Sequence, residues 1–262
     1  MEYMKFIKAE IVKQQKNYTR GIGNKISIVI WPLLIMIANM YTYFSFDIYN
    51  YIEENNMEIL IFFESGILVY NCFWNAVQGA FYLTRERQNG TLEMVMLAPS
   101  KMSAHMYGRA VAGVTQNILF MIILITMIIY TSGCNKESVF KCIAVVSIIS
   151  FTAIIWGGFV NSLFMISRDT RFLFALFDEP MYLFSGAKIP LNILPTWITF
   201  ISMLFPISFC MEIIRTIIYI GEIRVRTVIC LAIAILVIIA ITLLILTYAE
   251  RHNRKLGNIT LY

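Results

Sequence analysis

Two neighbouring carboxylates, Asp178 and Glu179, stand in the middle of an apolar stretch and directly before Pro180. A proline frees a backbone carbonyl in the preceding helical turn, and ionisable groups inside a membrane-spanning stretch usually face a bundle interior or an aqueous cavity. One interpretation is that a carboxylate lines a path and attracts a cationic or hydrogen-bonding substrate. The other is that the two acids are structural, either protonated or paired with Lys188 or Arg215.

A second group of polar side chains recurs along residues 59–83 at the spacing of a single helical face. Its members are Glu64, Asn71, Asn75, Gln78 and Tyr82. Such a face cannot favourably meet lipid. It either lines the same path or binds a neighbouring helix through hydrogen bonds.

Side chains that could catalyse a reaction or hold a metal do not gather in the sequence. No nucleophile–base pair emerges, and no G-x-x-x-x-G-K-[ST] loop is present to cradle ATP phosphates. His105 and His252 lie far apart, and the five cysteines form no CxxC pair or Cys/His cluster. We therefore expect no catalytic, cofactor or metal site in this chain.

The composition indicates which solvent surrounds these polar groups. Of 262 residues, 59% are hydrophobic and only 14% are charged, and the mean hydropathy is +0.71. A soluble core of this size could not hide so much apolar surface. The net charge of +5 is not displayed on a soluble domain, so we expect no binding to nucleic acid.

Apolar stretches long enough to cross a bilayer predict an all-α membrane protein with six transmembrane helices. The expected spans are Ile26–Phe46, Ile59–Leu83, Ala110–Thr131, Val139–Ser167, Arg171–Gly186 and Thr227–Ala249. A further apolar stretch before the last span is cut by Pro195 and Pro206 into two pieces that are each too short to cross. We expect this segment, about residues 190–220, to form an outer re-entrant helical pair covered by protein.

The distribution of charge favours six spans over seven. With both termini in the cytoplasm, fifteen of the 21 Lys and Arg residues fall on the cytoplasmic side, and the first outer loop is acidic. This is the positive-inside pattern, and a seventh span would place the basic tail, residues 250–262, outside. We expect a multi-pass protein of a bacterial plasma membrane, with residues 26–249 as the transmembrane domain and no cleavable signal peptide.

Residues 1–25 predict an amphipathic helix that lies in the cytoplasmic interface of the membrane. Met4, Ile7, Ile11 and Tyr18 share one face, and most of the cations lie on others. The helix is either a membrane anchor or a lever between a cytoplasmic partner and the first span.

The loop after the second span predicts a short helix with an apolar face. Gly90 permits a sharp reversal, Thr91 can cap the helix with Glu93 in its first turn, and Pro99 stops it. Its apolar face is formed by Leu92, Val95 and Met96. An exposed apolar face of this kind needs a partner.

Two motifs together resemble the permeases of type-2 ATP-binding-cassette (ABC) exporters. The first is Glu86 followed by Gly90-Thr91-Leu92-Glu93, an apolar run, Pro99 and later Gly108-Arg109. The second motif contains Gly186, Pro190, Pro195, Pro206 and Arg215 at matching spacing. The resemblance implies that residues of about 89–98 form the coupling helix, which docks on a separate ATPase subunit through Thr91, Leu92, Glu93, Val95 and Met96. It places Arg85 and Glu86 at the junction with the second span, and it places the second motif in the re-entrant pair.

The same resemblance implies the partners and the activity. ATP and Mg would be bound by the ATPase subunits, and a second permease copy or paralogue would complete the complex in the lipid bilayer. ATP-driven closure of the ATPases would push the coupling helices and open an outward path, with a small amphipathic drug or peptide as the favoured substrate. Lys188 departs from the family pattern. Two alternatives remain open: a membrane-embedded lipid-modifying enzyme, and a non-transporting immunity or sensor protein on the same scaffold.

Overall fold

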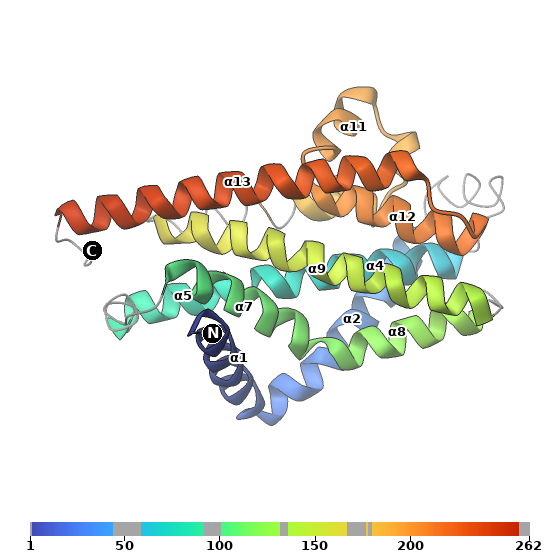
Figure 1. Cartoon of the computed structure of the whole chain (residues 1–262). Helices are drawn as coiled ribbons and strands as arrows, with labels where there is room; N and C mark the ends of the chain where they lie inside the picture. Colours follow the sequence, from blue (N-terminus) through green and yellow to red (C-terminus); the bar gives the residue numbers. More distant parts are fainter. Residues whose placement is uncertain are drawn as a thin grey trace.

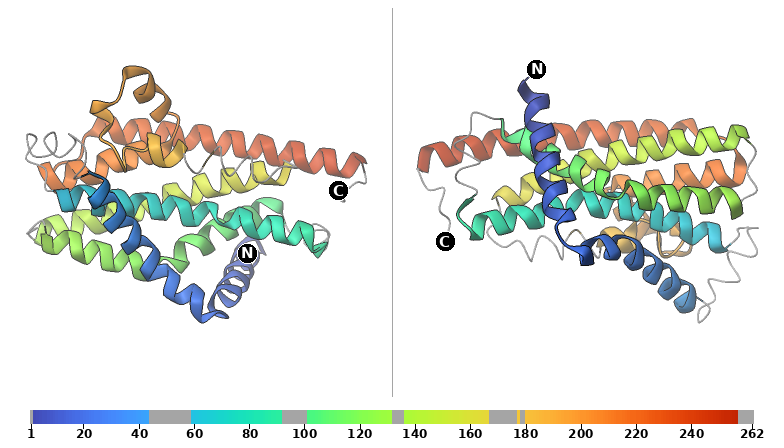
Figure 2. Two further views of the ribbon diagram at one scale, coloured as in Figure 1. Left: turned by 180° about the vertical axis from the view of Figure 1, so that it is seen from behind. Right: turned by 90° about the horizontal axis from the view of Figure 1, so that it is seen from below.

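The computed structural model is a helical bundle, and it describes residues 2–43, 59–91, 101–131, 136–166, 177 and 180–256. Every regular element in these ranges is a helix. The long helices run along one another, while the N-terminal helix crosses the bundle steeply (Figures 1 and 2). The C-terminal end of the last helix lies at the same end of the bundle as the tip of α5 (Figure 1).

The helices follow the expected spans but break them in places. The elements are α1 (Glu2–Thr19), α2 (Ile22–Tyr43), α4 (Ile59–Val77), α5 (Gly79–Gln88), α7 (Met102–Gln116), α8 (Ile118–Thr131), α9 (Lys136–Ile166), η1 (Leu191–Ile193), α11 (Thr196–Ser202), α12 (Pro206–Ile220) and α13 (Val225–Leu256). Helix α9 is central, because it packs against α4, α5, α7, α8, α12 and α13.

Glycines let the central helices approach closely. A side chain at Gly157 of α9 would place its Cβ 2.6 Å from the Ala76 carbonyl oxygen of α4, and a Cβ at Gly66 would lie 2.8 Å from the Ala187 carbonyl oxygen. A Cβ at Gly113 of α7 would overlap the Asn75 carbonyl. Small residues at helix crossings are typical of membrane bundles, where packing takes the place of the hydrophobic effect.

Three of the described helical segments are long and apolar enough to cross a membrane: Leu60–Gln88, Val139–Phe164 and Val225–Tyr248. Two bent pairs raise the number to five if each is one span, namely α7 with α8, bent by 49°, and α11 with α12, bent by 99°. Helix α2, which covers most of the first expected span, is not among them. Half of the fifth expected span lies outside the described residues, so the number six stays a prediction.

The N-terminal segment is helical as expected, and it buries two polar side chains against the bundle, while its position in a membrane interface stays a prediction. The most buried side chains of α1 are Glu10 and Gln14, at 3% and 2% exposed, whereas Met4 is 68% exposed. The reason is that α1 crosses α7 next to a buried arginine, and an acid satisfies that partner better than an apolar side chain does. The side chain of Tyr18 lies outside the described part of the chain.

The close crossing of α4 and α9 gives a direct test of the packing. Gly157→Ala places a methyl group against backbone that cannot yield, and we expect it to destabilise the protein by about 1–3 kcal/mol. Thermal unfolding of the purified protein in detergent measures the effect. The matched control is Gly23→Ala in α2, where a Cβ meets nothing within 4 Å and the better helix propensity of alanine should be neutral or stabilising. If the Gly157→Ala and Gly23→Ala variants were equally stable, the close packing of α9 against α4 at Gly157 would be contradicted.

Candidate functional site

A network of charged side chains ties α1 and α5 to α7. We call it the α1–α5–α7 network, and it consists of Glu10, Lys13, Glu86, His105 and Arg109. Arg109 Nε lies 3.2 Å from Glu10 Oε1, and Arg109 Nη2 donates a short hydrogen bond to Glu86 Oε2. Lys13 Nζ bridges both acids, at 2.5 Å from Glu86 Oε1 and 3.5 Å from Glu10 Oε1.

The network neutralises an arginine that has no contact with solvent. The side chain of Arg109 is 0% exposed and that of Glu10 is 3% exposed. An isolated charge at this depth would be very costly, so the two carboxylates are required for Arg109 to stay inside the fold. Gly108 makes the approach possible, because a Cβ at this position would already lie 3.1 Å from Glu10 Cβ.

The carboxyl of Glu10 is held in its ionised form. Burial by itself would raise its pKa, but a contact with His105 at 3.4 Å, the charge of Arg109, a 3.0 Å hydrogen bond from Gln14 and the charge of Lys13 together lower the pKa from 4.5 to about 2. Glu10 therefore remains an anion at any physiological pH.

The network reaches the expected start of the coupling helix. Gly90 adopts φ of 68° in a turn at the end of α5, which is the conformation that the expected reversal requires. The Thr91 hydroxyl donates to the Glu86 carbonyl at 3.2 Å, so the reversal is bonded to the residue whose side chain binds Arg109 and Lys13. Arg87 Nη2 adds a 3.1 Å bond to the Phe164 carbonyl near the end of α9.

The rest of the expected coupling segment lies outside the described residues. This applies to Leu92, Glu93, Val95 and Met96, and to the side chain of Arg85. Their contact with an ATPase stays a prediction.

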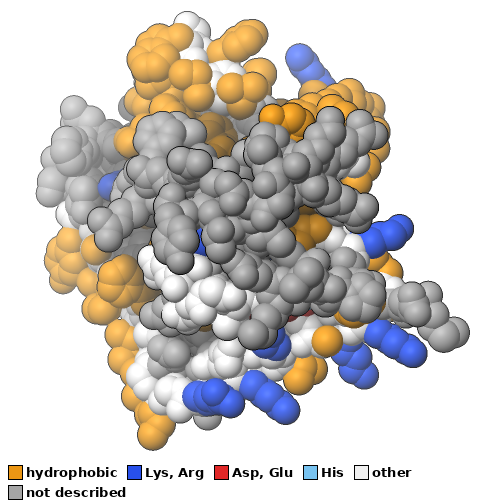
Figure 3. Space-filling model, turned by 90° about the vertical axis from the view of Figure 1, so that its left-hand side faces the viewer, with side chains coloured by type: hydrophobic (Ala, Val, Ile, Leu, Met, Phe, Trp, Pro, Cys, Tyr) orange, Lys and Arg blue, Asp and Glu red, His pale blue; other side chains and the backbone are white. Residues whose placement is uncertain are grey.

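The end of the bundle that carries α5 has a basic edge. Seen from that end, Lys and Arg side chains gather along the lower and right-hand edges, and hydrophobic side chains cover much of the upper part (Figure 3). Three cations of α1, Lys5, Lys8 and Lys16, and Arg20 directly after it are exposed to solvent.

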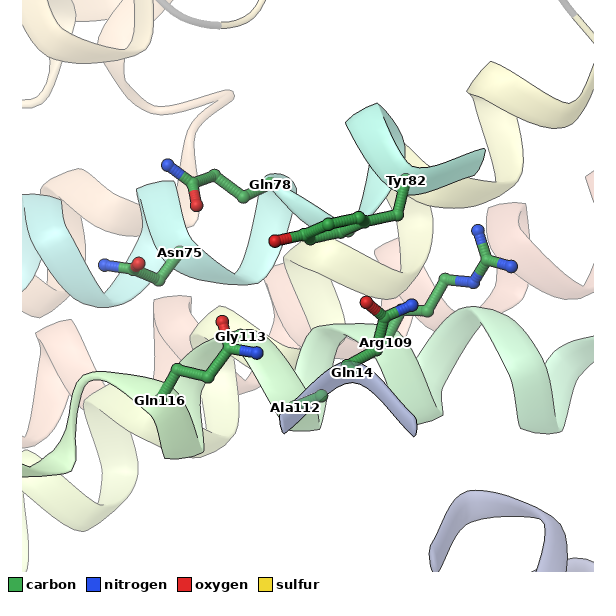
Figure 4. Close-up of a pocket in the computed structure, with 9 residues that line it drawn as sticks. Gln14, Asn75, Gln78, Tyr82, Arg109, Ala112, Gly113 and Gln116 are labelled. Carbon is green, nitrogen blue, oxygen red and sulfur yellow. The ribbon is translucent and has the colours of Figure 1, made fainter. Parts of the chain in front are cut away.

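Part of the predicted polar stripe lines a small pocket beside the network. Asn75, Gln78 and Tyr82 come from α4, α5 and the break between them, and Gln116, Arg109 and Gln14 face them from α7 and α1 (Figure 4). The cavity volume is about 10 Å³, which is room for one water molecule.

The remaining members of the stripe do not line this pocket. Asn71 accepts a 2.5 Å hydrogen bond from the Asn75 amide, so it supports the pocket wall. Glu64 is buried nearer the start of α4, at 1% exposed. Asp178 and Glu179 lie outside the described residues, so their role stays open.

The second motif forms the bent helical pair. Gly186 has φ of 76°, Pro190 and Pro195 precede η1 and α11, and Pro206 is the first residue of α12. A proline at a helix start loses no intrahelical hydrogen bond, which explains why the segment breaks where it does. Helix α11 projects from the side of the bundle (Figure 1).

Arg215 fastens this pair to α4. Its guanidinium donates to the carbonyls of Gly186 at 2.8 Å and Phe62 at 3.2 Å, and to Ser65 Oγ at 3.4 Å. It also lies 3.7 Å above the Phe62 ring. Glu212, three residues earlier on the same helix, instead contacts Arg224 at 3.5 Å.

The partners of Glu86 were not predicted from the sequence. Glu10, Lys13 and His105 carried no motif, and Arg109 entered only through the Gly108-Arg109 pair of the first motif. The available signal was Gly108 next to Arg109 in an otherwise apolar helix, with Glu10 as an acid within a basic helix. Within the described ranges, no three His, Cys, Asp or Glu side chains are grouped so that they could hold a metal ion.

Comparison with known families agrees with this arrangement. The family model described as ABC-2 type transporter matches residues 5–219. The chain belongs to this family. The matched region includes the α1–α5–α7 network, the Gly90 reversal and the bent pair of α11 and α12. No curated protein and no solved structure matches this ABC-2 transporter chain.

Removal of the buried guanidinium should destabilise this ABC-2 protein strongly. Arg109→Met leaves Glu10 and Glu86 with Lys13 as the one remaining Lys or Arg of the network, and breaking a buried pair costs about 3–5 kcal/mol. Adding Glu10→Gln to Arg109→Met should restore part of the loss. Thermal unfolding in detergent measures both variants.

The control for this prediction is Arg224→Met, which removes an arginine of the exposed pair with Glu212. An exposed pair contributes about 1 kcal/mol at most. If Arg109→Met lowered the stability no more than Arg224→Met does, the α1–α5–α7 network would not be the interaction that keeps α1 in place.

The pKa of Glu10 predicts how stability depends on pH. Because the pKa is lowered by folding, the ionised carboxylate stabilises the fold above pH 4.5, and this contribution disappears as the pH falls toward 2. The shift corresponds to about 3 kcal/mol. Unfolding temperatures of the wild type and of Glu10→Gln, measured from pH 7 to pH 3, should differ most at pH 7 and converge at low pH. If the difference in unfolding temperature between the two proteins did not change with pH, the lowered pKa of Glu10 would be contradicted.

Proposed function

We propose that this chain is the permease subunit of an ABC exporter and that a separate ATPase subunit drives it. The observation that carries the proposal is the family match, together with the bonding of the Gly90 reversal to the α1–α5–α7 network. The substrate, a small amphipathic drug or peptide, moves out of the cytoplasm. ATP and Mg belong to the partner, so this chain contributes no catalysis of its own.

The network gives a physical route for the coupling. A push on residues 91–98 reaches Glu86 through the Thr91 hydroxyl and the chain itself. Glu86 is bonded to Arg109 of α7 and to Lys13 of α1, so these helices shift together with the coupling segment. Arg87 carries the same displacement to the end of α9 through its bond to the Phe164 carbonyl. A conformational change of this kind requires that the ATPase contacts the two states differently.

The proposal includes six spans in the plasma membrane of a bacterium, with both termini in the cytoplasm. The tip of α5, the end of α13 and the basic α1 lie toward one end of the bundle (Figure 2), which supports this orientation. With both termini in the cytoplasm, α1 is the helix that lies in the cytoplasmic interface of the membrane. The 99° bend between α11 and α12 fits a re-entrant pair in the outer leaflet.

The substrate path is assigned to the polar face of α4 and to the acids of the fifth span. Its residues are Glu64, Asn71, Asn75, Gln78, Asp178 and Glu179. The pocket at Asn75 and Gln78 supports this assignment, because it brings carboxamides together beside the network that moves with the coupling segment. A second permease copy or a paralogue faces this path and completes it.

Co-purification with the ATPase tests the proposal. Leu92→Asp combined with Val95→Asp places two charges on the apolar face of the coupling helix, and we expect it to reduce recovery of a co-expressed ATPase subunit at least tenfold. Substrate-stimulated ATP hydrolysis should be lost in parallel. The matched control is Gln88→Asp with Asn89→Asp, which adds the same charge to exposed positions of the same loop. Full recovery of the ATPase with the Leu92 and Val95 variant would refute the docking role.

A further inference from the structure

An apolar groove lies at the end of the bundle opposite to the α1–α5–α7 network. It is bounded by α9, α12 and α13, and its volume is about 310 Å³. Its lining is aliphatic throughout: Ile148, Ile213, Ile223, Val225, Val228 and Leu231. The turn between α12 and α13, which forms one edge, is visible at the right of Figure 1.

The groove has a buried floor and exposed walls. Ile213 and Leu231 are 3% and 2% exposed, whereas Ile223 and Val225 are 45% and 70% exposed. The floor is therefore fixed by the core, and the walls open to the surroundings of the bundle. An open apolar groove of this size in a bilayer has acyl chains as its nearest available filling.

The rim of the groove carries cations at the level where two spans begin. The candidate spans of α9 and α13 start at Val139 and Val225, and Lys141, Arg224 and Arg226 stand within two residues of these starts. Lys141 Nζ donates to the Gly221 carbonyl at 3.2 Å, which holds the turn against α9. Arg224 and Arg226 are exposed, and their acidic neighbours among the described side chains are Glu212, 3.5 Å from Arg224, and the exposed Glu222.

We propose that this groove binds one acyl chain of a phospholipid whose phosphate is held by Arg224 and Arg226. The acyl chain alone has no preference for the groove over the bilayer, because lipid tails solvate it as well as leucine and isoleucine side chains do. Selectivity must come from the headgroup, and arginine matches phosphate through paired hydrogen bonds. The contact of Arg224 with Glu212 is exposed, so a phosphate can displace it.

The bound lipid would act on the joint between α12 and α13. The acyl chain of the lipid packs against Ile213 of α12 and Leu231 of α13, while the headgroup binds the turn that links these two helices. The bent pair before α13 and the last span would thus be fixed relative to one another. This inference does not depend on the exporter mechanism or on the ATPase.

Native mass spectrometry of the delipidated full-length protein tests the inference. The probes are dioleoyl phosphatidylglycerol, which has a phosphate, and dioleoylglycerol, which has the same chains without one. We expect the phosphatidylglycerol to bind at least tenfold more tightly than the dioleoylglycerol. The double variant Arg224→Gln and Arg226→Gln should abolish this difference, whereas Arg20→Gln at the other end should preserve it.

A second pair of variants tests the groove itself. Val228→Trp fills the groove from one wall and should weaken binding of both probes at least tenfold. The matched control is Val237→Trp, on the same helix and 52% exposed but outside the groove. If Val228→Trp does not purify as a monodisperse protein, Ile223→Trp fills the same groove from another wall and replaces it.

Three results would overturn the inference. The first is equal binding of the two probes by the wild type, and the second is unchanged binding of phosphatidylglycerol by the groove-filling variant. The third is a groove-filling variant that changes the oligomeric state of the protein in solution without changing lipid binding. The groove would then be a contact between copies of the protein.

Discussion

The buried guanidinium of Arg109 is the constraint on which the arrangement at one end of the bundle depends. A charge with no exposed surface is tolerated only when carboxylates surround it, and here the two carboxylates come from different elements, α1 and α5. Ion pairs from α1 to α7 and α5 therefore help to set the position of α1. Gly108 follows from the same constraint, because a larger side chain there would push Glu10 away from Arg109.

A second constraint is the close packing of α4, α7 and α9 around glycines. Polar groups beside these crossings are bonded within the bundle, as when the Asn161 amide donates to the Met106 carbonyl at 3.2 Å. Such contacts leave little freedom for the three helices to slide past one another. We therefore expect a displacement applied at α5 to be taken up first by the side-chain contacts of α1 and α5 with α7, and less by sliding among α4, α7 and α9.

The sequence predicts the long helices well and the network poorly. The fourth and sixth spans, expected at 139–167 and 227–249, agree closely with α9 and α13, because long apolar runs specify such helices by themselves. The bend at Asn117 was not predicted, since no proline or glycine marks it. The Gly90 reversal and the proline-led starts of α11 and α12 were predicted, because they follow from local backbone chemistry.

The candidate site shows why the rest could not be predicted. Glu10 and Arg109 lie far apart in the chain, and the periodicity of apolar residues in α1 marked a stripe that does not include Glu10. Hydrophobic periodicity finds the buried face only when burial is apolar, and in α1 it is ionic. The spacing of Asn75, Gln78 and Tyr82 did predict a shared face, since that pattern lies within a single stretch of chain.

The buried Arg109 and the half-buried Arg215 differ in a way that bears on how the protein moves. Arg215 is held mainly by backbone carbonyls of Gly186 and Phe62, whose positions are fixed by the fold itself. Arg109 is held by side chains of two separate helices, and side-chain ion pairs can exchange between discrete arrangements when those helices shift. Motion should therefore be concentrated at the Arg109 end, while the Arg215 end keeps the bent pair fixed to α4. In the proposed exporter mechanism, a push on the coupling segment would move the Arg109 end while the bent pair stays fixed to α4.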